Sequence, residues 1–176
     1  NLLCGRSRPG HFKGVATIVL KLLNITQPNV LYLGQKDFQQ ATIIKKMVAD
    51  LNIPVKVIVM PTVREKSGLA LSSRNLYLRG REKDDALALS RSLKTASFLI
   101  KDGVRDAASI IKKMRAVISE KKSAKIDYLE IVDEKNLMPL KKIAGNCLIL
   151  IAVFIGKTRL IDNIVIRNIS CSNSRG

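Results

Sequence analysis

The N-terminal third of the chain alternates between amphipathic helix patterns and short apolar runs. Apolar residues recur at helical spacing over residues 11–27 and again over 38–51. Each stretch is followed by a run rich in Val, Ile and Leu, at 30–33 and 55–60. This order is typical of a parallel sheet whose strands are joined by crossover helices. Ligands of such sheets bind beyond the carboxyl ends of the strands, so the segments that follow the two runs are candidate site segments.

The chain from residue 76 onward has a different organisation. Two amphipathic helix patterns, at 89–100 and 104–118, are separated by the helix stop Asp102-Gly103. Three strand-like runs follow, at 126–132, 147–155 and 159–166. Gly156-Lys157 between the last two runs predicts a tight hairpin. This part of the chain therefore reads as a small α+β domain.

These patterns divide the chain into three parts. We expect residues 1–75 to belong to the α/β domain, residues 76–167 to form the α+β domain, and residues 168–176, rich in Ser and Asn, to form a disordered tail. The chain begins without an initiator Met and runs at once into a structured pattern. We therefore expect it to be a piece of a longer protein.

Composition restricts the partners. A total of 31 Lys and Arg against 14 Asp and Glu gives a net charge of +17, spread over both halves, which favours anionic ligands. Aromatic residues make up only 4% and Trp is absent, so the stacking surface for single-stranded nucleic acid is poorly supplied and we expect no nucleic-acid partner. The longest apolar run, 147–155, is too short to cross a bilayer as a helix, so we expect no membrane partner. The three cysteines lie far apart without a C-x-x-C pattern, which favours reduced thiols without a metal.

The segment after the first apolar run is the first candidate site. Gly34 at its start would let the backbone approach a ligand closely. Asp37 is a good N-cap for the next helix, and the free N–H groups of a helix start attract anions. Lys36 adds a positive charge, and the Gln40 amide, one turn into the helix, can reach the same place. A capped helix with a solvent-facing lysine fits the same residues.

The second candidate segment is the polar stretch 61–75. Ser72, Ser73 and Arg74 place two hydroxyls and a guanidinium together on a loop that contains glycine. Because Arg matches phosphate geometry with two parallel hydrogen bonds, this loop fits a clamp for a triphosphate. A polar linker between two domains has the same composition.

The N-terminal residues offer weaker signals. His11 is the only histidine, so a general acid–base step at neutral pH would fall to it, although a loop or cap role is more common after Pro-Gly. Arg6 and Arg8 can pair with an anionic substrate or remain exposed loop residues. For His11, Arg6 and Arg8 the sequence therefore leaves a functional role and a structural role open.

Five motifs, in this order, carry a family resemblance. They are Arg8-Pro-Gly-His-Phe-Lys-Gly-Val15, Gly34-Gln-Lys-Asp-Phe-Gln-Gln40, Pro61-Thr-Val-Arg-Glu65, Gly68-Leu-Ala-Leu-Ser-Ser-Arg-Asn75 and Gly156-Lys-Thr-Arg-Leu-Ile-Asp-Asn163. Together they resemble the pantothenate synthetase (pantoate–β-alanine ligase) family of the nucleotidyltransferase superfamily. The resemblance runs from about residue 3 to residue 166, and five motifs in register are more specific than any one of them.

The resemblance implies a fold and a reaction. Residues 1–75 would be the second half of a Rossmann-like domain, with a parallel sheet and crossover helices, and residues 76–167 a lid over its cleft. The pantoate carboxylate would attack the α-phosphorus of ATP to give pantoyl adenylate and pyrophosphate. The β-alanine amine would then displace AMP and give pantothenate. Mg²⁺ would accompany the triphosphate, and the family is homodimeric and cytoplasmic.

The resemblance also implies site residues, carried over by position. The residues that would contact ATP are Gly34, Gln35, Lys36, Asp37, Val63, Leu71, Ser72, Ser73 and Arg74. Those from Leu71 to Arg74 resemble the KMSKS loop that closes over phosphates, and Gln40 would bind pantoate. The resemblance assigns no catalytic residue and no metal ligand within this chain.

The chain departs from the family in two respects. Gln35 stands where the family usually has Glu, a change that we expect to be tolerated. The histidine-containing, HIGH-like motif of the family and its second pantoate-binding Gln are absent from the sequence, and His11 belongs to a different motif. The sheet would also lack its first strands, which leaves an apolar edge uncovered. We therefore predict that these residues alone are inactive and prone to aggregate.

Two other functions fit parts of the pattern. One is a basic module without catalysis that binds anions or RNA. The other is a different adenylate-forming nucleotidyltransferase of the same superfamily, because the substrate identity depends mainly on Gln40. Dependence of binding on adenine favours a ligase, whereas a steep salt dependence with oligonucleotides favours the module.

Overall fold

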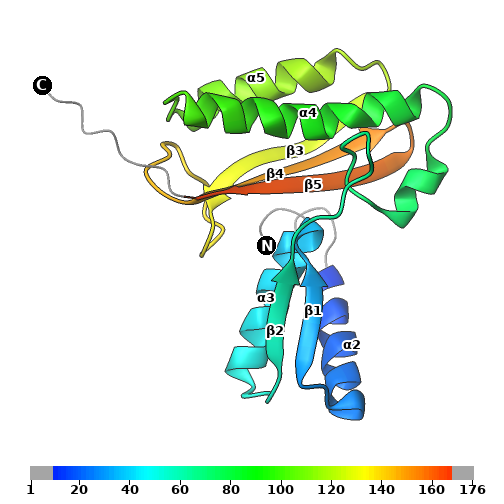
Figure 1. Ribbon diagram of the computed structural model, residues 1–176, viewed down its shortest axis with the longest axis vertical. Coiled ribbons are helices and arrows are strands. Elements are labelled where there is room, and N and C mark those ends of the chain that lie inside the picture. Colours follow the sequence, from blue (N-terminus) through cyan, green and yellow to red (C-terminus); the bar gives the residue numbers. More distant parts are fainter. Residues whose placement is uncertain (1–9, 168–176) are drawn as a thin grey trace, which may run out of the picture. The chain divides into compact units, whose positions relative to one another are not determined.

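The structure is a computed structural model of the chain and describes residues 10–167 (Figure 1). Its contacts form two compact units, Asn1–Val63 and Arg64–Gly176. The tail expected at 168–176, like Arg6 and Arg8, lies outside the described residues.

The first unit has the predicted order of elements. Helix α2 (His11–Thr26), strand β1 (Val30–Gly34), the short 3-10 helix η1 (Gln35–Asp37), helix α3 (Phe38–Asp50) and strand β2 (Lys56–Met60) follow one another. The two strands pair in parallel, in register from Val30↔Lys56 to Gly34↔Met60. The predicted parallel sheet with crossover helices is therefore confirmed for this pair of strands.

The core of the first unit is small. Its buried centre consists of Leu23 from α2 with Ile44 and Val48 from α3. No residue of β1 or β2 is fully buried, and Tyr32 on β1 is 62% exposed. Strands of parallel sheets are normally buried on both faces, whereas every residue of β1 is either partly buried or exposed. That the sheet lacks its first strands remains a prediction.

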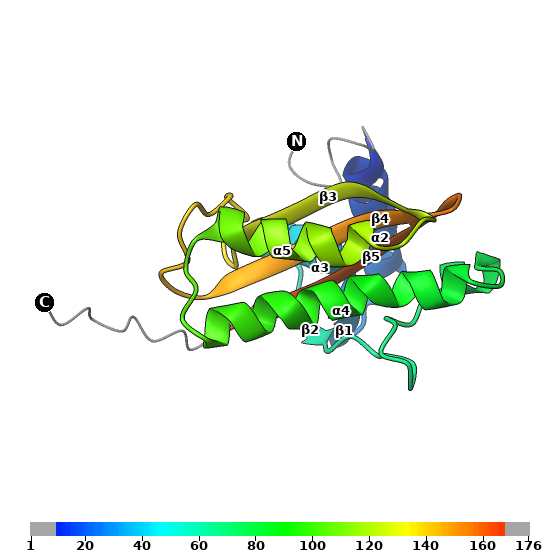
Figure 2. The same ribbon diagram turned by 90° about the horizontal axis from the view of Figure 1, so that it is seen from above.

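The second unit begins with a folded loop and continues as an α+β structure. The 3-10 helix η2 (Ser73–Tyr77) leads into helices α4 (Glu82–Lys101) and α5 (Ala107–Ser119), which are followed by strands β3 (Ala124–Asp133), β4 (Cys147–Ile155) and β5 (Thr158–Ile166). The strands form an antiparallel sheet in the order β3-β4-β5. Helices α4 and α5 lie side by side on one face of this sheet (Figures 1 and 2).

Local sequence explains where these elements end. Acidic side chains crowd the first turn of α4, where they favour the positive end of the helix dipole. The helix ends at Asp102, and Gly103 adopts a left-handed φ of 94°, as the predicted helix stop requires. The hairpin between β4 and β5 is also confirmed, because Ile155 pairs with Thr158 across a two-residue turn in which Gly156 has φ 56°.

The contacts divide the chain earlier than the domain boundary expected after residue 75. Segment 64–75 groups with the second unit because Arg64 pairs with Asp162 of β5 and Leu69 joins the core beneath α4. The sequence places the change of helix and strand pattern after this segment, whereas its tertiary contacts attach it to the α+β unit. The boundary of the functional domains at residue 75 remains a prediction.

Candidate functional site

The first candidate segment lies at the carboxyl end of β1. Gly34 is the last residue of the strand, Gln35–Asp37 form the single 3-10 turn η1, and α3 begins at Phe38. A Cβ built on Gly34 would meet no atom, so there is free space beside the backbone at this point. The segment therefore occupies the place where ligands of parallel sheets bind, and its backbone is open to approach.

The side chains of this segment carry both charges. The Lys36 ammonium lies 3.7 Å from the Asp37 carboxylate, and the Lys36 side chain is only 19% exposed. Gln35 and Gln40 are partly buried, with Gln40 in the first turn of α3. An ammonium, two amides and a carboxylate are thus gathered at one helix start.

The prediction that Asp37 is the N-cap of α3 is confirmed for its position, without a capping bond from its side chain. Asp37 occupies the N-cap position, but its side chain accepts no capping hydrogen bond. Its backbone, at φ −98° and ψ 54°, completes the turn η1, and the carboxylate faces Lys36 instead. The capping pattern in the sequence identified the helix start and missed the extra turn.

The second candidate segment is a folded loop at the start of the second unit. An antiparallel bridge joins Arg64 to Ala70, and Glu65 N–H donates to the Leu69 carbonyl at 2.9 Å. Gly68 forms the turn with φ 93°, a conformation that suits glycine. This loop has its own hydrogen bonds, which a plain linker would lack.

The predicted phosphate-binding residues follow that turn. Leu71 is 56% exposed, and Ser72 caps η2, because its Oγ accepts from Arg74 N–H at 3.3 Å. Ser73 begins η2 and is exposed. Arg74 donates from Nη1 to the carbonyl of Arg159 on β5 at 3.1 Å. Two hydroxyls and a guanidinium therefore lie next to one another around a helix start.

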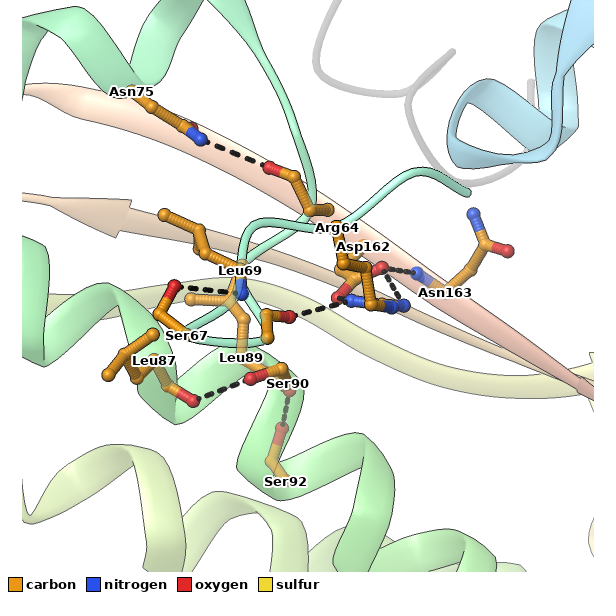
Figure 3. A network of polar contacts seen from close by, with 12 residues as sticks. Arg64, Ser67, Leu69, Asn75, Leu87, Leu89, Ser90, Ser92, Asp162 and Asn163 are labelled. Carbon is orange, nitrogen blue, oxygen red and sulfur yellow. Dashed lines mark hydrogen bonds and ion pairs between the residues drawn. The ribbon is translucent and has the colours of Figure 1, made fainter. Parts of the chain in front are cut away.

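Sequence reasoning missed the pairing of Arg64 with Asp162. The two Nη atoms of Arg64 donate to the two carboxylate oxygens of Asp162 at 2.7 and 2.9 Å, as Figure 3 shows. Both residues lie in motifs that carry the family resemblance, but neither received a role. The available signal was the position of Asp162 in β5, two residues from Leu160 and from Ile164, which predicts a buried charge that needs a partner.

The structure gathers the predicted residues into two groups. Gly34 to Asp37 and Gln40 lie together in the first unit, and Val63, 65% exposed, is the last residue of that unit. Leu71 to Arg74 lie together in the second unit. Each group is exposed in part.

Other chemistry-bearing residues are less informative. His11 starts α2, and its ring centre is 5.1 Å from that of Phe12. Cys147 lies buried in the central strand, where desolvation raises the pKa of its thiol to about 11. Within residues 10–167, no three His, Cys, Asp or Glu side chains converge in a way that could hold a metal ion. In the same range, no helix is long and apolar enough to cross a membrane.

Comparison with known proteins gives a consistent result. The sequence model of the pantoate–β-alanine ligase family matches residues 1–165. The chain belongs to this family. Among curated members of the pantoate–β-alanine ligase family, the pantothenate synthetase of Moorella thermoacetica is 54% identical over 165 residues, which is 94% of this chain and 58% of that protein. That of Pseudothermotoga lettingae is 52% identical over 167 residues, 95% of this chain and 59% of that protein.

Solved structures of the pantoate–β-alanine ligase family share the fold. The pantothenate synthetase of Thermus thermophilus superposes with a TM-score of 0.89 at 39% identity, covering 93% of this chain and 59% of that one. A pantoate–β-alanine ligase from Francisella tularensis, crystallised with β-γ ATP and β-alanine, matches with a TM-score of 0.70 at 40% identity and covers 94% of this chain and 54% of that one. The chain thus spans just over half the length of these relatives.

Proposed function

We propose that this chain is part of an ATP-dependent ligase that joins pantoate to β-alanine through a pantoyl-adenylate intermediate. Membership of the pantoate–β-alanine ligase family carries the proposal. The Francisella relative, solved with β-γ ATP and β-alanine, supports ATP as co-substrate and β-alanine as the amine. The arrangement of Gly34 to Asp37 at the carboxyl end of β1 is consistent with nucleotide binding there.

The two reaction steps have clear electrostatic needs. A carboxylate oxygen of pantoate forms a bond to the α-phosphorus, and the bond from that phosphorus to the β-phosphate oxygen breaks as pyrophosphate leaves. The amine of β-alanine then forms the amide bond and loses a proton, while AMP leaves. Both steps concentrate negative charge, which cations, hydroxyls and backbone N–H groups stabilise. Lys36, Ser72, Ser73 and Arg74 are groups of this kind.

We assign the remaining site residues by the same proposal. Gln35, Asp37 and the backbone at Val63 contact the nucleotide, Leu71 belongs to the segment that covers the phosphates, and Gln40 binds pantoate through its amide. The described residues carry no histidine besides His11, to which the proposal gives no proton-transfer role.

Mg²⁺ fits this site as a partner of the triphosphate. Mg²⁺ usually keeps several waters and binds through substrate phosphates with one or two carboxylates. Segment 34–40 offers a single carboxylate, Asp37, already 3.7 Å from Lys36, and Glu65 in segment 61–75 accepts from the Asn75 amide at 2.8 Å. The phosphate oxygens would therefore hold the ion, which would neutralise charge on the triphosphate.

The scope of the proposal is set by the length of the chain. The chain covers 58% and 59% of its Moorella and Pseudothermotoga relatives. We propose that the printed residues bind nucleotide, whereas ligation needs the HIGH-like motif that they do not contain. We also propose, from family membership, that residues 76–167 form a lid, that the protein is a homodimer and that it is cytoplasmic.

Nucleotide binding is tested with a non-hydrolysable ATP analogue and Mg²⁺ in calorimetry. We expect Lys36→Ala to weaken binding by about tenfold, the usual effect of losing a charge-assisted hydrogen bond. Lys46→Ala is the matched control, because Lys46 lies on α3, the helix that follows Lys36, and pairs with Asp50 at 3.0 Å near the end of that helix. An equal loss in both variants would show only a general charge effect.

The reaction is tested on the native protein with pantoate labelled by ¹⁸O in its carboxylate. An acyl adenylate transfers one labelled oxygen to AMP, so AMP, not ADP, must form and carry the label. Unlabelled AMP would rule out the adenylate step. Strong binding of RNA with a steep salt dependence, and none of the ATP analogue, would favour the basic binding module instead.

A further inference from the structure

The loop that carries Ser72, Ser73 and Arg74 is attached at its start by a charged pair. Arg64 donates from both Nη atoms to the two oxygens of Asp162, 98 residues further along the chain. Its Nη1 also donates to the Gly68 carbonyl at 3.2 Å, inside the same loop. In Figure 3 the guanidinium lies between β5 and the loop turn. Arg64 therefore joins the turn directly to the sheet.

Asp162 is an unusual residue for the interior of a sheet. Its side chain is 2% exposed, and along β5 it lies two residues from Leu160 and from Ile164, both of which pack in the core with α4 and α5. A buried carboxylate is strongly unfavourable without a charged partner. Besides Arg64, Asp162 accepts only from its neighbour Asn163 N–H, at 2.8 Å, among the contacts of the described residues. The arginine is thus the group that compensates the charge.

The end of the loop is attached to the same strand. Arg74 Nη1 donates to the Arg159 carbonyl on β5 at 3.1 Å. The Asn75 amide donates to the Glu65 carboxylate at 2.8 Å and to the Ala70 carbonyl at 3.1 Å, which ties the two sides of the loop together. Both ends of segment 64–75 are therefore fixed to β5, and the serines lie between the fixed points.

We propose that Asp162, acting through Arg64, is a positioning residue for the phosphate-binding loop. The inference rests on the proposed function for the role of the loop, but not for its geometry. A loop held in its binding geometry before the ligand arrives loses less conformational entropy on binding. Asp162 contacts no substrate in this scheme; it fixes Arg64, and Arg64 fixes the turn that presents Ser72 and Ser73.

The test combines hydrogen exchange with binding of the ATP analogue, both on the whole chain. In Asp162→Asn, a near-isosteric change, we expect the amides of Glu65, Gly68 and Asn75 to exchange about tenfold faster, while Ile149 and Ile151 in β4 keep their protection. Affinity for the analogue should fall by about five- to tenfold. Arg64→Lys keeps a charge beside Asp162 without the second hydrogen bond, so it should give intermediate values and remain folded.

The matched control is Glu134→Gln. Glu134 also pairs with an arginine, Arg167, in the same unit, but neither residue touches segment 64–75. We expect this variant to match the wild type in loop exchange and in affinity. Unchanged loop exchange in Asp162→Asn would overturn the inference, and so would faster exchange throughout the sheet. If the loop loosens but the wild-type chain binds no analogue, the positioning role stands and the proposed function fails.

Discussion

The carboxylate of Glu82 occupies the space that a side chain at position 156 would need. Gly156 lies in the turn between β4 and β5 with φ 56°, and a Cβ there would collide with Glu82 Oε1. Glu82 in turn accepts from Arg79 N–H at 2.9 Å, and Gly156 N–H donates to the Ser123 carbonyl at 2.8 Å. The hairpin turn, the start of α4 and the approach to β3 thus meet at one glycine.

Gly156→Ala should destabilise the chain by about 1–2 kcal/mol, the cost of a left-handed conformation for a residue with a Cβ. Displacement of Glu82 would add the loss of its hydrogen bond to Arg79. The free energy of unfolding in urea measures the total. The double variant Gly156→Ala, Glu82→Ala separates the cost of the left-handed backbone from the cost of the collision. The collision is relieved in this variant, whereas the backbone cost remains. A Gly156→Ala variant as stable as the wild type would contradict both.

Asp106→Ala should lower stability at pH 7, because Asp106 caps α5. Its carboxylate accepts from Ser109 N–H at 2.7 Å. Bonds from the side chain and then the backbone of Ser109 hold the pKa of Asp106 below its usual 3.8. The charged form is therefore favoured in the folded state, so its contribution is present above the usual pKa and is lost as pH falls through the lowered one.

Urea unfolding of both proteins across that pH range measures this effect. The difference in free energy of unfolding between the wild type and Asp106→Ala should decrease as the pH falls below the usual pKa of Asp106. Asp102→Ala, at the C-terminal end of α4, is the control and should not lower stability at pH 7, since a negative charge is unfavourable there.

Cys147 should react with iodoacetamide only when the chain unfolds. Burial raises the pKa of its thiol to about 11, against a usual value of 9.0, so little thiolate forms at neutral pH. The folded state holds this proton to higher pH than the unfolded state, so the contribution of Cys147 to stability falls as pH rises from 9.0 towards 11. In a Cys4→Ser, Cys171→Ser variant, Cys147 is the remaining cysteine, so mass spectrometry of the labelled protein measures the alkylation of Cys147 alone. Rapid labelling in the absence of urea would refute the expectation.

Gln35→Glu, which introduces the residue that the family usually has, should change affinity for the ATP analogue by less than about threefold. Gln35 is partly buried in η1, next to Lys36, so the added charge would have a cation nearby. Calorimetry on the variant and the wild type gives the ratio directly. A loss comparable to that of Lys36→Ala would mean that position 35 requires a neutral amide.

The helices and strands could be predicted from the sequence wherever local residues determine where an element begins and ends. β4 has the predicted bounds because it consists of nine consecutive apolar residues, which are followed by Gly156. α4 begins earlier than the apolar pattern at residue 89 indicated, because its first turn is acidic and gives no apolar signal. For segment 61–75 the sequence predicts a clamp or a linker and leaves both open, because the bonds that fix its residues 64–75 to β5 join residues far apart in sequence.

In the candidate site too, the features set by local sequence were predicted, and those set by contacts between distant residues were not. Lys36 and Gln40 were found because they follow an apolar strand and begin a helix, a pattern that is local. The pairing of Arg64 with Asp162 could not be derived from spacing, because it depends on which strand lies beneath the loop. The place of Asp162 between Leu160 and Ile164 indicates a buried charge, but the sequence does not indicate which of 31 basic residues compensates it.

The order of the elements in the second unit also bears on how the chain acquires its structure. Helices α4 and α5 are neighbours in sequence, as are the three strands, so most of this unit can form through contacts that close short loops. Helix α4 also packs on β4 and β5, but the attachment of segment 64–75 spans more of the chain, because Arg64 must find a partner 98 residues away on the last strand. The loop can therefore be fixed only once β5 has joined the sheet. In refolding, we expect the phosphate-binding loop to be among the last parts to become protected and, in unfolding, among the first to open.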